Sequence, residues 1–469
     1  MAAVFFPSLR TVRMAIGALM SIASFVALAL PHAAIAENPR IYRVASEGRE
    51  IAYAAAVDAE GNFYIGGQFE GDAASSFGVA KFDSDGDLLW RQRYGGSQGG
   101  QLGWVRHLAI DVDANVIATG GILTADGQTT DLLTVKFATD GTELWAHREV
   151  GSINSFGTRV AVDAAGSVYV GGSATRASVD WLLLKYDRLG KLLWQRTMDG
   201  TARGDDYIVD LQTTASGGVA VVGFNEYQAP GSGLQAAIAK FDANGAEQWR
   251  RTYLAAGHRD SLPLDMTLDS RDAVLITGLT SPNVRSGIAA SVPFTIKLSP
   301  TGRMQLELNG PAAGGATVLT DKLDQIILAG AISRDSKDTS LAGPIVSTVS
   351  KYDAQGNQLW TSSLGIAGTF DVARAALAES GAVFVAGTYS KRKGSDSIVR
   401  KLAEDGRSLW EYRYNPSGIG ADTVIDLVVA ADGRAAVLGS SAHGKIADPV
   451  LMMFDALSAP ARVTGAVTQ

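Results

Sequence analysis

The sequence predicts an all-β fold, an eight-bladed β-propeller with four strands in each blade. A pattern of about 50 residues recurs along the chain, and each copy holds four short strand-like stretches separated by turns. Glycine supplies 53 of the 469 residues, above the usual ~7 %, which indicates many tight turns. A closed ring of repeats lets a chain of this length form one domain, although compact single cores stop growing at roughly 250–300 residues.

Each repeat is marked by a lysine, a glycine and a tryptophan at fixed spacing. The full set recurs six times, and its lysines and tryptophans are Lys81, Trp90, Lys136, Trp145, Lys185, Trp194, Lys240, Trp249, Lys351, Trp360, Lys401 and Trp410. A further copy has Lys297 but carries Leu306 in place of tryptophan. Packing residues are needed once per blade, whereas a catalytic group is needed once per protein. We therefore expect tryptophan to be buried between blades and lysine to make a polar contact from blade to blade.

In the first unit the strands are expected at about 51–57, 62–67, 77–82 and 87–93. The second strand of the unit ends in glycine eight times, at Gly67, Gly120, Gly172, Gly223, Gly278, Gly330, Gly387 and Gly439. The eighth copy stops after a third strand near 451–454, and residues 40–44 stand where a fourth strand is missing. We expect this N-terminal strand to complete the last blade. A ring of seven blades is the alternative, if the fifth or sixth unit merges with a neighbour; an open solenoid is less favoured, because it would need capping ends.

The first 36 residues have the pattern of a secretory signal. Arg10 and Arg13 precede an apolar run, which is followed by Pro31 and by the small-residue sequence 34–36. We expect cleavage after Ala36, a propeller over 37–457 and a C-terminal tail over 458–469. An uncleaved membrane anchor is the alternative. No cysteine is present to carry a disulfide or a lipid anchor, so the expected product is periplasmic or secreted, without membrane insertion.

Composition argues against several classes of function. The formal net charge of −7 gives no basic surface for nucleic acid. The four histidines after the signal segment are far apart, and two aspartate-rich turns, at 83–87 and 111–115, lack the full ligand set of a calcium loop. We expect no metal site, no cofactor and a monomer.

The sequence 163–172, followed by 181–187, Gly190 and Trp194, resembles the SBBP β-propeller repeats of exported bacterial proteins. The half of the unit with the turn and the tryptophan is also similar to the repeats of quinoprotein-like propellers. The likeness covers residues 40–455 and implies a propeller in an exported protein. It implies no activity, because such propellers include scaffolds, binding modules and enzymes. No segment matches a quinone-binding or metal-binding site.

One position of the innermost strand changes from blade to blade in an informative way. Its residues are Ala54, His107, Arg159, Asp210, Asp265, Thr317, Arg374 and Asp426. Six are ionisable, and they are expected at one level near the central axis. Arg159 beside Asp210, and Arg374 beside Asp426, would form pairs that hold neighbouring blades together. The alternative is a polar central site for a small ligand, in which Asp265 has no opposite charge in either neighbouring copy.

Longer links between the second and third strands of blades four to six form a second candidate site. They contain Tyr227, Asn283, Arg285, Arg334 and Lys337. Loops on a rigid scaffold commonly carry recognition. The leading hypothesis is a non-catalytic exported propeller that binds a protein or an envelope component through these links. The alternative is an enzyme that uses the central ring, such as a polysaccharide lyase, a hydrolase or a quinone-dependent dehydrogenase.

Overall fold

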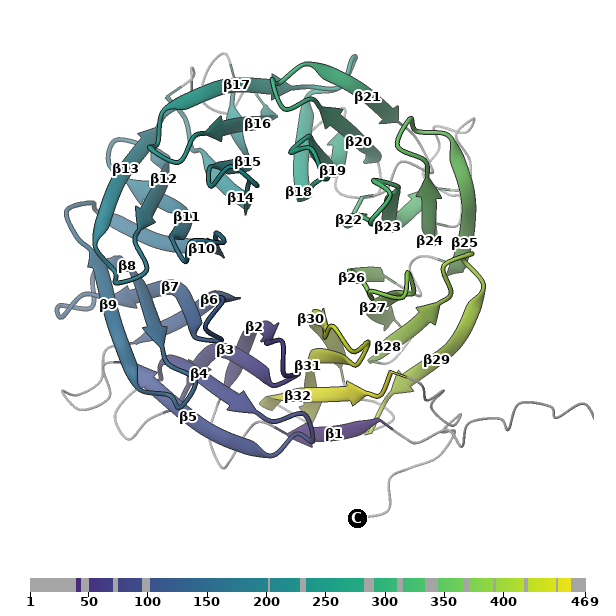
Figure 1. Cartoon of the computed structure of the whole chain (residues 1–469), viewed down its shortest axis with the longest axis horizontal. Coiled ribbons are helices and arrows are strands. Elements are labelled where there is room, and N and C mark those ends of the chain that lie inside the picture. The colour runs from purple at the N-terminus through teal and green to yellow at the C-terminus, as the bar shows by residue number, and fades with distance from the viewer. Residues whose placement is uncertain are drawn as a thin grey trace, which may run out of the picture.

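A computed structural model gives the fold of the chain (Figure 1). The structure describes residues 39–43, 50–70, 75–94, 102–200, 203–227, 233–281, 291–309, 315–333, 345–366, 371–390, 394–416, 421–443 and 446–456. The residues of the expected signal segment lie outside this set. Within the described residues, no helix has the length and apolar character needed to cross a membrane.

Eight four-stranded antiparallel sheets are arranged as blades around a ring (Figure 1). Blade one holds β2 (Ile51–Val57), β3 (Phe63–Phe69), β4 (Ser76–Phe82) and β5 (Leu88–Tyr94). Blade two holds β6 (Gly103–Ile110), β7 (Val116–Leu123), β8 (Thr130–Phe137) and β9 (Glu143–Glu149). Blade three holds β10 (Asn154–Val162), β11 (Val168–Thr175), β12 (Val179–Tyr186) and β13 (Leu192–Met198). Blade four holds β14 (Tyr207–Thr213), β15 (Val219–Glu226), β16 (Leu234–Phe241) and β17 (Glu247–Tyr253).

The second half of the ring repeats this order. Blade five holds β18 (Asp260–Leu268), β19 (Val274–Ser281), β20 (Val292–Leu298) and β21 (Met304–Asn309). Blade six holds β22 (Thr317–Thr320), β23 (Ile326–Ser333), β24 (Ile345–Tyr352) and β25 (Gln358–Ile366). Blade seven holds β26 (Asp371–Leu377), β27 (Val383–Ser390), β28 (Ser395–Leu402) and β29 (Ser408–Tyr414). Blade eight holds β30 (Asp422–Val429), β31 (Ala435–His443), β32 (Ile446–Phe454) and, as its outer strand, β1 (Arg40–Arg43).

The eighth blade confirms the predicted closure. β1 pairs antiparallel with β32, with Tyr42 opposite Leu451, and the purple and yellow strands lie together in Figure 1. Tyr42 contacts Gly86 of blade one, the same contact that a tryptophan makes elsewhere in the ring. The ring therefore has eight blades, and the alternative of seven is wrong. The predicted strands of the first unit agree with β2 to β5 to within two residues.

Tight turns close one face of the ring. In the turn between β2 and β3, the Asp58 amide donates to the Asn62 carbonyl at 3.0 Å, and the Gly61 amide donates back to the Asp58 carbonyl at 3.1 Å. Gly61 has a φ of 81°, in the left-handed region that favours glycine. Equivalent pairs of hydrogen bonds close the first-to-second strand turns of the other seven blades and the third-to-fourth strand turns of blades one to seven. The links on the opposite face differ from blade to blade.

The hydrophobic core consists of layers between neighbouring blades. One layer packs Tyr169 and Trp194 of blade three against Ile208 and Val221 of blade four. The layer at the closure is built in the same way, with Phe63 of blade one in the same cluster as residues of β31 and β32. Because the strands of each blade are covered on both faces by neighbouring blades, their apolar residues form near-continuous runs.

Candidate functional site

The innermost strands place the candidate ring residues at one level. In seven of these strands the pairing with the second strand shifts by one residue directly before the ring position, as between Pro263 and Asp265 in β18. Such a β-bulge locally bends the strand and redirects a side chain. In blade six the described strand β22 begins at the ring position itself, Thr317.

Two pairs of ring residues form the expected contacts between neighbouring blades. The Nε of Arg159 lies 3.2 Å from Oδ1 of Asp210, and the Nε of Arg374 lies 3.6 Å from Oδ1 of Asp426. Each arginine also donates a hydrogen bond to the backbone carbonyl of the preceding residue. All four side chains keep some exposure to solvent. These contacts join blade three to blade four, and blade seven to blade eight.

Three other contacts connect a ring side chain to the backbone of the next blade. Asp426 accepts a hydrogen bond from the Ala55 amide at 2.9 Å, which links blade eight to blade one. Asp265 accepts one from the Val318 amide at 2.8 Å, and Nδ1 of His107 accepts one from the Val160 amide at 3.4 Å. The innermost strand is a sheet edge, so these amides lack a strand partner. The ring side chains satisfy them.

Burial and neighbouring charges strongly shift the pKa values of two ring residues, His107 and Asp265. Burial, with the positive charges of Arg159 and Arg374, lowers the pKa of His107 to about 3. At neutral pH this imidazole is uncharged, which fits its role as an acceptor at Nδ1. Burial and the adjacent charge of Asp210 raise the pKa of Asp265 to about 8, although both arginines oppose the shift. Asp265 therefore holds a proton at neutral pH, and it forms no ion pair within the described residues.

The residues at the bulges were missed by the sequence reasoning. Arg106 directly precedes His107, and its guanidinium lies 5.4 Å from the centre of the Tyr53 ring in blade one. Leu264, which precedes Asp265, is 40 % exposed. No sequence pattern marked this bulge, because strict alternation along the strand assigns Leu264 to the covered face.

The repeated tryptophans connect blades through their indole nitrogens as well as by packing. Trp194 donates to the Ala243 carbonyl of the next blade at 3.1 Å, and four equivalent residues, Trp90, Trp145, Trp249 and Trp360, make the same bond. Trp410 instead stacks on Phe454, with ring centres 5.3 Å apart. Trp194, Trp249 and Trp410 are buried, whereas the other three remain partly exposed.

Five of the seven repeated lysines lie within hydrogen-bond distance of a backbone carbonyl of the next blade: Lys81, Lys136, Lys185, Lys240 and Lys401. All but Lys401 also pair with an aspartate that the sequence analysis did not predict. Lys136 donates to the Arg188 carbonyl of blade three at 3.3 Å and lies 2.6 Å from Asp111 of its own blade. Further pairs of this kind are Lys81–Asp58, Lys185–Asp163, Lys297–Asp269 and Lys351–Asp321, while Lys240 pairs with Asp272 of the next blade. In blade seven the aspartate is replaced by Ala378, and burial lowers the pKa of Lys401.

Only one of the candidate partner-binding residues in the links is described. The hydroxyl of Tyr227 donates to the Arg259 carbonyl at 3.1 Å, so its side chain fastens the link of blade four to the start of blade five. Asn283, Arg285, Arg334 and Lys337 lie outside the described residues.

Comparisons with known proteins show the fold and no activity. No protein-family model matches the chain, and a search of curated proteins found no match. The solved structure of Sqt1 from Chaetomium thermophilum is similar with a TM-score of 0.53 and 10 % identity, over 89 % of this chain and 100 % of that chain. The WD40 domain of SCAP from fission yeast has a TM-score of 0.49 at 8 % identity, over 88 % and 98 %. A PL25 ulvan lyase has a TM-score of 0.41 at 12 % identity, over 91 % and 94 %.

Proposed function

We propose that this protein is an exported, non-catalytic β-propeller that binds a protein or a component of the cell envelope through the face formed by its longer links. The proposal rests on the contacts that the ionisable side chains of the central ring make with neighbouring blades. Four of its six ionisable residues form ion pairs between blades, and His107 and Asp265 bind backbone amides of the next blade. These groups fasten blades together, so their charges do not require a reaction to explain them.

The difference between the two faces favours the link face for recognition. The turn face is closed by short turns with the same hydrogen bonds in each described blade. The links between second and third strands vary, from 124–129 in blade two to 334–344 in blade six. A rigid scaffold that carries links of different length and composition is typical of binding proteins. The N-terminal pattern of Arg10, Arg13 and an apolar run supports export.

A replacement of links tests the proposal. Residues 282–290 and 334–344 would each be replaced by the sequence 124–129, which forms a described turn in this same protein. We expect tagged wild-type protein to retain a defined partner from an envelope extract, and the replaced variant to lose it while keeping the same circular dichroism and Tm. A matched control changes the exposed Glu60 of the turn face to Gln. Equal capture by all three proteins, or no specific capture by the wild type, would refute the proposal.

One observation favours a second candidate, an enzyme or small-ligand site at the ring. Asp265 is protonated at neutral pH and forms no ion pair within the described residues. A carboxyl in this state can donate a proton in acid catalysis or a hydrogen bond to a ligand. Screening of Asp265→Asn and His107→Ala for loss of hydrolase, lyase or dehydrogenase activity, and of ligand-induced melting shifts, tests this candidate. Unchanged behaviour of both variants would remove its basis.

A further inference from the structure

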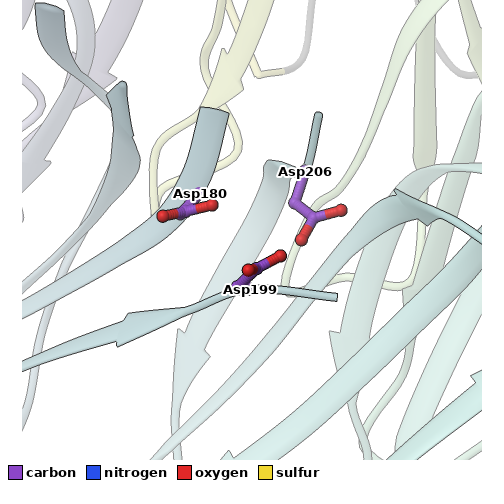
Figure 2. Close-up of side chains that lie close together, drawn as sticks. All are labelled: Asp180, Asp199 and Asp206. Atoms are coloured by element: carbon purple, nitrogen blue, oxygen red, sulfur yellow. The ribbon is translucent and has the colours of Figure 1, made fainter. Parts of the chain in front are cut away.

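Three carboxylates converge where blade three meets blade four (Figure 2). Asp180 belongs to the start of β12, Asp199 directly follows β13, and Asp206 directly precedes β14. One oxygen of each lies within 4.8 Å of the others. Calcium ligands lie about 2.3–2.6 Å from the ion, so two oxygens on one ion can be separated by up to about 5 Å. The spacing of the three groups therefore fits a single calcium ion.

Equivalent aspartates in other blades have an arginine that this one lacks. Asp131 of blade two lies 2.5 Å from Arg148 on the fourth strand, and the equivalent pair of blade seven, Asp396 and Arg413, is 3.8 Å apart. In blade three the arginine position is occupied by Thr197. Of these three junctions, the one that lacks the arginine is therefore the one where two further carboxylates, those of Asp199 and Asp206, approach the aspartate.

No lysine or arginine takes over the role of counter-ion at this junction within the described residues. Arg250 lines the same hollow, but its guanidinium lies 2.8 Å from Glu247. Arg176 acts on Asp180 only through its longer-range charge, and no ion pair joins the two among the described residues. Asp180 accepts a hydrogen bond from the Ser178 hydroxyl at 2.9 Å, which adds no charge.

Buried polar atoms without a partner lie around the same hollow. Asp206 is 2 % exposed and its Oδ1 has no hydrogen-bond partner, as is the case for Oδ1 of Asn225 and Nε1 of Trp181. All three residues, with Asp199, line a hollow of about 20 Å³. That volume holds one water-sized occupant, for which about 10–15 Å³ is needed. A single water could donate to both acceptors, but it would leave the charge of the converging carboxylates unbalanced, whereas a cation neutralises it. A water bound to the cation can accept from the indole N–H.

A comparison with blade five shows which carboxylate oxygen of Asp206 has a structural role. Oδ2 of Asp206 accepts a hydrogen bond from the Gly200 amide at 2.5 Å. At the equivalent place of blade five, Oγ of Ser261 accepts the same bond from the Ala255 amide at 3.0 Å. A serine therefore suffices to hold this link. The additional, unpartnered oxygen of Asp206 is not explained by the architecture of the repeat.

We propose that Asp180, Asp199 and Asp206, together with the amide oxygen of Asn225, bind one Ca²⁺ ion that fastens blade three to blade four. All donors are oxygens of carboxylates or an amide, the set that a hard cation takes. Mg²⁺ binds at 2.0–2.1 Å in a strict octahedron and usually keeps several of its waters, so it suits a site built from four protein oxygens less well. The exposed Asp199 marks the side from which the ion and its waters enter. The inference is independent of the proposed partner binding.

Terbium luminescence tests the site directly, because Trp181 lines it and can sensitise bound Tb³⁺. The purified protein is first treated with a chelator. We expect saturable Tb³⁺ emission that Ca²⁺ displaces, and a rise in Tm of about 2–3 °C at a Ca²⁺ concentration about 100 times the Kd. Asp206→Ser, which preserves the Gly200 hydrogen bond, should weaken Ca²⁺ binding at least about tenfold and reduce the rise in Tm to about half or less. Glu60→Gln, a loss of one exposed carboxylate in blade one, should change neither.

Two results would overturn the proposal: Tb³⁺ emission that Ca²⁺ does not displace, or Ca²⁺ binding by Asp206→Ser equal to that of the wild type. Should Asp206→Ser lose the circular dichroism of the wild type, Asp199→Asn replaces it. Asp199 is exposed and no hydrogen bond of its side chain ties it to the described fold, so its amide variant should fold and bind Ca²⁺ at least about fivefold more weakly. Wild-type affinity in that variant would equally overturn the site. None of these outcomes bears on the binding of a partner through the links.

Discussion

Asp265 makes a sharp prediction, because its substitution should stabilise the protein at alkaline pH. Burial and the charge of Asp210 raise its pKa to about 8, and its Oδ2 accepts a hydrogen bond from the Val318 amide. In Asp265→Asn the amide oxygen can accept the same bond. The variant therefore keeps the contact between blades five and six and removes only the titration.

The magnitude follows from proton linkage. The carboxyl has a pKa near 3.9 in an unfolded chain and about 8 in the folded protein. Between these values the folded protein holds a proton that the unfolded chain has released, so its contribution is fully present below pH 4 and is lost as the pH rises through 8. The slope is at most about 1.4 kcal/mol per pH unit. Because Asp265 is partly exposed and Arg159 and Arg374 oppose the shift, we expect about 1–2 kcal/mol between pH 5 and 8.

Guanidinium unfolding of the wild type and Asp265→Asn at pH 5, 6, 7, 8 and 9 measures this difference. The two proteins should have similar free energies of unfolding at pH 5, and the variant should be more stable by about 1–2 kcal/mol at pH 8. Glu60→Gln serves as a control for the loss of one surface charge. A stability difference that does not change with pH, or an Asp265→Asn variant that is less stable at pH 8, would refute the reasoning.

Further predictions concern the contacts between blades. Trp194→Ala should lower the free energy of unfolding by about 3–5 kcal/mol, and Trp194→Phe by less, measured by denaturant titration. Gly245→Ala should cost more than Gly127→Ala: both have positive φ, but only at Gly245 does a Cβ meet the Trp194 ring; equal losses would contradict this contact. Lys136→Met should cost about 3–5 kcal/mol by the same titration, because it leaves a buried aspartate unpaired. Deletion of residues 37–43 should expose β32 and yield larger assemblies in size-exclusion chromatography; an elution volume equal to that of the wild type would contradict that role of β1.

The fold could be predicted because the same packing and turn residues recur from blade to blade. A tryptophan at one fixed position and a glycine with positive φ recur in most units. A unit whose own pattern is weak can therefore be assigned by aligning it with the others. In the eighth blade, both members of the repeated lysine–aspartate pair are replaced. The eighth blade has Ala430 in place of the aspartate and Met453 in place of the lysine, so the pair is absent as a unit.

The candidate site could be predicted only in part, because it depends on what differs between blades. The position of Arg159 and Asp210 followed from the alignment of the repeats, and so did their opposite charges. The convergence of Asp180, Asp199 and Asp206 did not, since it joins residues from three strands across a junction. The sequence feature that marks this cluster is Thr197, which stands where blades two and seven have an arginine. The feature could be interpreted only after the structure had shown that this arginine pairs with the aspartate equivalent to Asp180.

The pairing of β1 with β32 has a consequence for the order of folding. Each blade is built from hairpins between neighbouring segments, which form within microseconds, because their contacts are local. The seam joins residues near both ends of the described chain and cannot form until the last blade has been synthesised. One long-range contact, rather than the many local ones, should therefore set the rate at which the ring closes. A circular permutant that moves the seam into another blade would fold to the same ring by a different final step.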